Sequence, residues 1–281
     1  MKAEETIMVK FTHDQISPHI IRIIEPGVYC YLVKGTEKAL LIDTGWGIGD
    51  LRGYAEYLLQ GLPYTVAVSH CHVDHVNGAG LFDEVYMSEK DWFMYDAEYD
   101  LQHRKNDLKM FGRNYPEMAD IVMADFNCKR TDPFLPLHDG DVFDLGGVHV
   151  RAVSVPGHTA GMTMFLIEED RIMFYGDGCT KHTFMFTNGA LSIREYLAGL
   201  RYLKTYDDCY DTVIRSHNIY TQPKHILDEN IELCELILAD QDARRQTVTA
   251  GTVCYEAALT DEKGQRIDGK TANLYYTDAN L

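Results

Sequence analysis

The amino-acid sequence predicts a mixed α/β fold, and two kinds of segment indicate it. Short runs rich in β-branched and apolar residues, at 28–33, 39–42 and 64–68, predict buried strands. Segments with apolar residues at helical spacing, at 51–59 and 191–204, follow such runs and predict helices with one face on a sheet. The 281 residues and their 46% apolar content suffice for a full core in one large domain.

The first half of the chain begins with a predicted hairpin. Two apolar runs, 28–33 and 39–42, enclose the polar turn Lys34-Gly35-Thr36-Glu37. A helix over 51–59 and a short strand over 84–87 are expected to follow. Ser88-Glu89-Lys90-Asp91 resembles a capping box, and it predicts the start of a mostly helical stretch that extends to about residue 129.

The second half contains a second predicted hairpin and two helices. Strands over 162–167 and 171–175 form the hairpin, and 32–43 aligns with 166–177 without a gap, which is weak evidence for an internal duplication. Ser192 to Glu195 forms a capping box that starts the helix ending at 204. The remaining expectations are two strands within 142–155, a strand at 212–215, a helix at about 223–244, and a polar hairpin over 249–276 around Lys263-Gly264-Gln265.

Charge and composition exclude several classes of protein. The formal net charge of −17 repels polyphosphate, so nucleic acid is not an expected partner. No run approaches 18 apolar residues and residues 1–10 hold no apolar signal core, so neither a membrane span nor a secretion signal is expected. The seven scattered cysteines have no CxxC spacing, which favours free thiols in a reducing cytoplasm.

Four metal-capable side chains lie within six residues, directly after the predicted strand at 64–68. His70 and His72 are two apart in an extended segment, so both point to one side and can hold one ion. Asp74 and His75 point elsewhere and can hold a second ion. Imidazole nitrogen and carboxylate oxygen suit zinc, and they also suit iron or manganese. The full stretch reads Ser69-His70-Cys71-His72-Val73-Asp74-His75.

The chain resembles the metallo-β-lactamase superfamily at five stretches, in the order of that family, over about residues 28 to 218. The family fold that this resemblance implies is an αββα sandwich of two mixed sheets with a dinuclear metal site at one edge. The stretches are Leu41-Ile42-Asp43-Thr44-Gly45, His-x-His-x-Asp-His at 70–75, Pro156-Gly157-His158-Thr159-Ala160-Gly161, Gly176-Asp177-Gly178 and Ser216-His217.

The resemblance also implies a role for each conserved type of residue in this chain. Two divalent ions, zinc by preference, are expected to share Asp177, and Asp43 is expected to orient a ligand from beneath. Asp74 and Asp177 are the expected catalytic carboxylates, and Cys71 is expected to pack away from the ions. The implied ligands are His70, His72 and His158 for one ion, and Asp74, His75 and His217 for the other.

The expected organisation is a single domain over 1–281. It includes a helical cap at about 88–130, as in related proteins, and a C-terminal helix plus hairpin at about 222–281. The last segment is expected to pack on the sheet edge or to form a contact in a homodimer. The candidates for substrate contacts are Trp92, Tyr95, Phe111, His182 and Tyr220.

The implied activity is the hydrolysis of an ester, thioester, lactone or lactam bond in a small, partly apolar molecule. Metal binding lowers the pKa of water from about 15.7 towards 7, so a hydroxide nucleophile exists at neutral pH. Three alternatives stay open: a mononuclear iron dioxygenase acting on a persulfide, a phosphodiesterase or nuclease, and a binding protein without activity. The filled ligand positions disfavour the last, and His72 stands where flavodiiron proteins of this family carry Glu.

Overall fold

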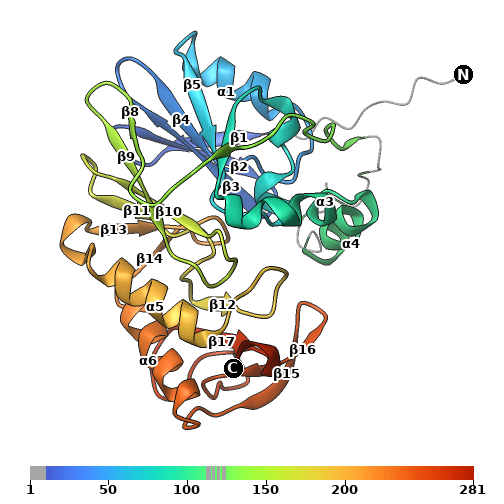
Figure 1. Cartoon of the computed structure of the whole chain (residues 1–281), viewed down its shortest axis with the longest axis vertical. Coiled ribbons are helices and arrows are strands. Elements are labelled where there is room, and N and C mark those ends of the chain that lie inside the picture. Colours follow the sequence, from blue (N-terminus) through green and yellow to red (C-terminus); the bar gives the residue numbers. More distant parts are fainter. Residues whose placement is uncertain (1–10, 112–114, 116–117, 119–120, 122–124) are drawn as a thin grey trace, which may run out of the picture. The chain divides into compact units, whose positions relative to one another are not determined.

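The computed structural model describes residues 11–111, 115, 118, 121 and 125–281, and Figure 1 shows its strands and helices. Residues 1–10, for which the sequence predicts no signal segment, lie outside the described residues. The chain forms two compact units. Unit 1 comprises Met1–Leu137 and Phe143–His149, and unit 2 comprises His138–Val142 and Val150–Leu281. The prediction of one domain over the whole chain stays a prediction.

Unit 1 is built on a seven-stranded mixed sheet. Its first four strands are antiparallel, and its last three run parallel to the fourth. Every residue of the fourth strand is buried, as its apolar run predicts. In spatial order the strands are β1 (Thr12–Gln15), β2 (Ile20–Glu25), β3 (Val28–Lys34), β4 (Ala39–Ile42), β5 (Tyr64–Ala67), β6 (Val85–Met87) and β7 (Leu135–Pro136).

The helix α1 (Leu51–Leu59) confirms the predicted helix after the first hairpin. It begins at Asp50, whose carboxylate accepts a hydrogen bond from the Gly53 amide at 2.8 Å. The helix buries Leu51, Ala55 and Leu59, and its two leucines pack in the same apolar cluster as residues of β4 and β5. This cluster supports the strand ends from which the metal-capable side chains begin.

The predicted capping box at 88–91 is wrong. Ser88 precedes the 3-10 helix η2 (Glu89–Met94), but its side chain makes no capping hydrogen bond. The Asp91 carboxylate instead accepts a hydrogen bond from the Cys71 amide at 3.0 Å, so a contact with a distant loop replaces the local cap. The helices α3 (Tyr95–Glu98) and α4 (Leu101–Phe111) follow, and residues 127–134 are not helical.

Unit 2 holds a second mixed sheet. Its order is β14-β13-β11-β10-β9, and β8 continues it at the edge. The helix α5 (Ile193–Lys204) begins with the predicted capping box, in which Ser192 and Glu195 exchange hydrogen bonds. The strands are β8 (Val142–Asp144), β9 (His149–Ser154), β10 (Thr163–Ile167), β11 (Ile172–Phe174), β13 (Thr212–Ile214) and β14 (Thr221–Gln222).

The C-terminal part of unit 2 differs from the prediction in two places. The helix α6 (Ile226–Leu238) ends before the expected residue 244, because Asp240 adopts a left-handed backbone with φ of 55°. An additional hairpin turns at Ala250 and Gly251, both with positive φ. The expected antiparallel pairing about 263–265 is also present, because Tyr255 pairs with Tyr276 and the Asp261 amide donates to the Gln265 carbonyl at 2.8 Å. A third sheet results, in the order β12 (His182–Phe184), β17 (Asn273–Tyr276), β16 (Thr252–Glu256) and β15 (Arg245–Thr249).

The two units repeat one pattern of elements, which agrees with the alignment of the two hairpins. In unit 1, β2, β3 and β4 form an antiparallel meander, α1 follows, and β5 lies parallel to β4. In unit 2, β9, β10 and β11 form the meander, α5 follows, and β13 lies parallel to β11. An aspartate follows the third strand and a Ser-His pair follows the parallel strand each time: Asp43 with Ser69-His70, and Asp177 with Ser216-His217.

Within the described residues, no helix has both the length and the apolar character needed to cross a membrane.

Candidate metal centre

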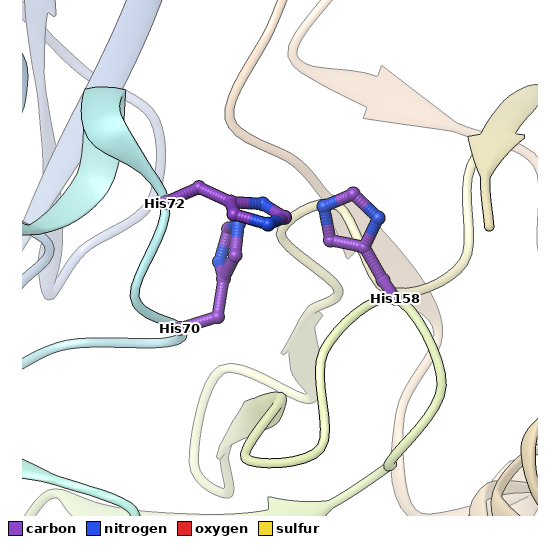
Figure 2. A group of neighbouring side chains, drawn as sticks. All are labelled: His70, His72 and His158. Atoms are coloured by element: carbon purple, nitrogen blue, oxygen red, sulfur yellow. The ribbon is translucent and has the colours of Figure 1, made fainter. Parts of the chain in front are cut away.

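The histidine motif of unit 1 lies on the loop between β5 and the short helix α2 (Val73–Val76). Figure 2 shows His70 and His72 on the same side of this loop, as their spacing predicts. The ring centroids of His70 and His72 are 4.7 Å apart. The ring centroid of His75 lies 4.1 Å from that of His70, so the two predicted ligand pairs are adjacent.

Asp43 lies buried beneath this motif and holds it by three hydrogen bonds. One carboxylate oxygen, Oδ1, accepts from the Ser69 amide at 2.7 Å. The other, Oδ2, accepts from the Ser69 hydroxyl at 2.9 Å and is 2.9 Å from His75 Nδ1. The structure therefore places Asp43 where the sequence analysis expects a residue that orients a ligand.

These hydrogen bonds determine which nitrogen of each ring carries hydrogen. An ionised carboxylate only accepts, so His75 Nδ1 donates to Asp43. Ser69 gives its single hydroxyl hydrogen to Asp43 and therefore accepts from His70 Nδ1 at 3.0 Å. With hydrogen on Nδ1, each ring presents the lone pair of Nε2, which is the form that binds a metal. The donor set of unit 1 thus fits a divalent ion.

Cys71 has the packing role that the sequence predicts. Its side chain is fully buried in the apolar cluster of unit 1. Burial raises the pKa of the Cys71 thiol well above its usual range, so the group stays protonated. A neutral thiol within an apolar cluster fits this packing role.

His158 of unit 2 follows β9 and is held by the last residue of β12. Its Nδ1 donates to the Phe184 carbonyl at 2.7 Å, so Nε2 presents the lone pair here as well. The Leu191 amide donates to the Gly157 carbonyl at 2.8 Å. Gly157 leaves no room for a side chain, because a Cβ there would lie 2.1 Å from Cδ2 of Tyr196.

Asp177 and His217 meet at one edge of the unit 2 sheet. They follow β11 and β13, two neighbouring parallel strands, so the strand ends bring them together. His217 Nε2 is 3.1 Å from Asp177 Oδ2, and both side chains are about a quarter exposed. Unit 2 therefore gathers an acceptor pair of the kind that divalent ions bind.

The predicted substrate-contact residues have varied surroundings, and their roles stay predictions. Trp92 donates to the Met87 carbonyl at 3.1 Å, and Tyr95 is buried, with its hydroxyl accepting from the Arg130 amide. Phe111 ends α4, but its side chain lies outside the described residues. His182 is exposed on β12, and Tyr220 is half-buried.

Sequence reasoning missed two features next to the predicted ligands. The Phe184 carbonyl fixes the His158 ring, and a main-chain acceptor leaves no sign in a sequence. Arg104 of α4 is fully buried and donates to the carbonyls of Trp46 and Gly47 at 2.8 and 2.9 Å. A charged residue within an exposed-looking helix gives no signal for such a role.

The buried Glu25 is expected to make the free energy of unfolding depend on pH. Burial, opposed by the hydrogen bond from the Trp46 amide, raises its pKa to about 8. Between its ordinary value of 4.5 and about 8 the folded state keeps a proton that the unfolded state has lost, so stability falls as pH rises through this window. Glu25→Gln is expected to flatten that dependence in urea unfolding of the metal-free protein. Glu84→Gln, at an exposed position, is the control, and an unchanged slope would contradict the expectation.

The fold and these donor sets define a mixed α/β protein with the side chains of a metal site. Residues 24–189 match the family described as the metallo-beta-lactamase superfamily, and the chain belongs to that superfamily. A metallo-beta-lactamase from Pontibacter korlensis has a similar structure, with a TM-score of 0.57 at 16% identity over 80% of this chain and 99% of that chain. The predicted family and fold are thereby confirmed.

Curated relatives of the chain carry the names of hydrolases. It is 27% identical to the atrochrysone carboxyl ACP thioesterase dmxR1 of Cryptosporiopsis sp., over 69% of this chain and 53% of the relative. It is 28% identical to the probable polyketide biosynthesis zinc-dependent hydrolase BaeB of Bacillus velezensis (53% and 54%). It is also 28% identical to the acyl-coenzyme A thioesterase MBLAC2 of Bos taurus (52% and 56%). The chain spans about half the length of the curated relatives it matches.

Proposed function

We propose that the chain is a metal-dependent hydrolase that cleaves the thioester bond of a small acyl substrate. The observation that carries this proposal is the fixed Nδ1–H of three histidines, His70, His75 and His158, each of which presents Nε2 to a metal. Rings oriented in this way by hydrogen bonds are typical of metal ligands.

The proposed ligands are the residues that the resemblance to the superfamily implies, and their side chains suit a dinuclear site. Zinc is the proposed metal, because the donors are imidazoles and carboxylates and because one relative is named a zinc-dependent hydrolase. Iron and manganese suit the same donors. The proposed groups are His70, His72 and His158 for one ion, Asp74, His75 and His217 for the other, and Asp177 shared between them.

In the proposed reaction, water adds to the thioester carbonyl carbon, the carbon–sulfur bond breaks, and the products are a carboxylic acid and a thiol. Bound metal ions supply a lowered pKa for the attacking water and polarise the carbonyl oxygen. Asp74 is partly exposed and lies 3.5 Å from His75 Nε2. We assign it to accept the proton of the water and to return a proton to the leaving sulfur.

Thioesters are favoured among the expected substrates because two relatives with different partners, an acyl carrier protein and coenzyme A, are both named thioesterases. Esters, lactones and lactams belong in the same substrate panel, since a shared fold does not fix the substrate. The cytoplasmic location and the homodimer expected from the sequence stay proposals.

Metal removal tests the function directly. The protein purified without chelators is expected to contain about two zinc ions per chain by elemental analysis. Chelation should abolish thioester hydrolysis, and added zinc should restore it. Chelation should also lower the melting temperature, because a metal that binds the folded state stabilises that state. His158→Gln should lower the zinc content, whereas His138→Gln, at a largely exposed side chain, should not.

Two outcomes would contradict the proposal. Full thioesterase activity in protein shown by elemental analysis to be free of metal would remove the metal from the reaction. About one iron ion per chain, with oxygen uptake in the presence of a persulfide, would instead support the dioxygenase alternative.

A further inference from the structure

We propose that Phe184 and Phe186 form an aromatic shelf that binds the acyl group of the substrate and selects thioesters with aromatic or long apolar acyl groups. This inference rests on the proposed function and adds a substrate class to it. The two residues follow Asp177 in the chain and were not among the substrate contacts expected from the sequence.

The two phenyl rings form one continuous apolar surface. Their centroids are 5.2 Å apart and their planes differ by 29°, which is a stacked arrangement. Neither ring is fully covered, because both residues are half-buried. The shelf therefore offers apolar area that a ligand can remove from water.

Strand alternation explains the direction of the Phe184 ring. Thr183 and Met185 are buried, and Met185 belongs to the apolar core of unit 2. Phe184 pairs with Tyr275 across the parallel strands β12 and β17, and the Met185 amide donates to the Tyr275 carbonyl at 2.8 Å. Since alternate residues of a strand point to opposite faces, Phe184 turns away from that core. Phe186 lies in the bend after β12, and its ring stacks on that of Phe184.

Hydrogen bonds connect the shelf segment to His158 on both sides of Phe186. Before it, the Phe184 carbonyl accepts from His158 Nδ1 at 2.7 Å. After it, the Thr187 hydroxyl donates to the His158 carbonyl at 3.4 Å. Phe186 is therefore fixed within a short stretch of chain that contacts a proposed metal ligand at two points.

The position of the shelf favours the acyl group as its occupant. A thioester whose carbonyl carbon is attacked near His158 must extend its acyl and thiol portions in two directions from that point. Planar, stacked rings match an aromatic acyl group in shape and polarity, and they match a long alkyl chain by apolar contact. The thiol portion nearest the reacting sulfur of natural thioesters carries amides, which gain little from two phenyl rings.

Phe186→Ala separates acyl recognition from catalysis. The test compares acetyl, hexanoyl and benzoyl thioesters of N-acetylcysteamine, so that only the acyl group changes. We expect KM for the benzoyl and hexanoyl substrates to rise about tenfold, with kcat retained, and the acetyl substrate to change less than about twofold. Phe93→Ala removes an aromatic side chain that is 71% exposed in unit 1 and is the matched control.

A second variant and a binding measurement guard against misfolding. Phe184→Ala keeps the main-chain carbonyl that holds His158, although it also removes a ring contact with Tyr275 at 5.6 Å between centroids. Melting temperature and zinc content are measured for every variant. Calorimetry of acetate, hexanoate and benzoate, the product acids, should give a preference for the apolar acids that Phe186→Ala removes.

The two proposals fail in different ways. If the metal-loaded wild type hydrolyses no thioester, the proposed function is overturned. If thioesters are hydrolysed but Phe186→Ala affects all acyl groups equally, or leaves the preference among the acids unchanged, the shelf is overturned. The shelf would also be overturned if the effect of Phe186→Ala on KM differed between benzoyl-N-acetylcysteamine and benzoyl-coenzyme A, because these substrates share the acyl group and differ only in the thiol.

Discussion

Asp43→Asn is expected to lower the zinc affinity of the chain by about 10- to 100-fold, the usual effect of removing a residue that hydrogen-bonds to a metal ligand. The carboxylate accepts hydrogen bonds from the Ser69 amide, the Ser69 hydroxyl and His75. The amide group of Asn has one accepting oxygen and one donating nitrogen. In one orientation that nitrogen faces the Ser69 amide hydrogen, and in the other it faces the hydrogens of the Ser69 hydroxyl and of His75 Nδ1. Either way the side chain loses at least one of the hydrogen bonds that hold the histidine loop.

Asn is chosen so that the substitution does not change the backbone conformation at residue 43. Asp43 has a φ of 65°, a left-handed conformation that Asn adopts readily and Ala does not. Asp50→Asn is the matched control, because it makes the same chemical change at an exposed helix start where Asn is an equally good cap. Zinc affinity from competition with a chromophoric chelator gives the measurement. Equal affinities for wild type and Asp43→Asn would show that the orienting role is unimportant.

The sequence predicted those parts of the fold that local pattern determines. The hairpin of β3 and β4 follows from two apolar runs around a polar turn, and α5 follows from the capping box at Ser192. The histidine motif lies directly after β5, as the apolar run before it in the sequence predicts. In each case residues within about ten positions carry the signal, and tertiary contacts support the same outcome.

The errors arose where a distant contact outweighed a local pattern. The predicted capping box at Ser88 is wrong because the Asp91 carboxylate accepts a hydrogen bond from the Cys71 amide, twenty residues away in the sequence. The helix α6 stopped early because Asp240 is left-handed, although its sequence continues with helix-compatible residues. The support of His158 by the Phe184 carbonyl was invisible for a related reason, since any residue type supplies that acceptor.

Gly157→Ala is expected to destabilise the protein by about 1–3 kcal/mol, the usual cost of overpacking a filled core. The added Cβ would lie 2.1 Å from Cδ2 of Tyr196 and 2.8 Å from its Cγ. Tyr196 is fully buried on α5 and has no room to withdraw. The loop that carries His158 must then move, so the variant should also bind less zinc.

A double-mutant cycle separates this clash from other effects of the substitution. Tyr196→Leu removes the ring atoms that meet the new Cβ, at the cost of a cavity in the core. If the clash is the cause, Gly157→Ala should cost less in the Tyr196→Leu background, and unfolding in urea with the metal removed measures the coupling. If the losses of unfolding free energy in the two single variants simply add in the double variant, another property of Gly157 is the cause. If the double variant binds zinc better than Gly157→Ala alone, the packing of Gly157 against α5 determines the position of His158.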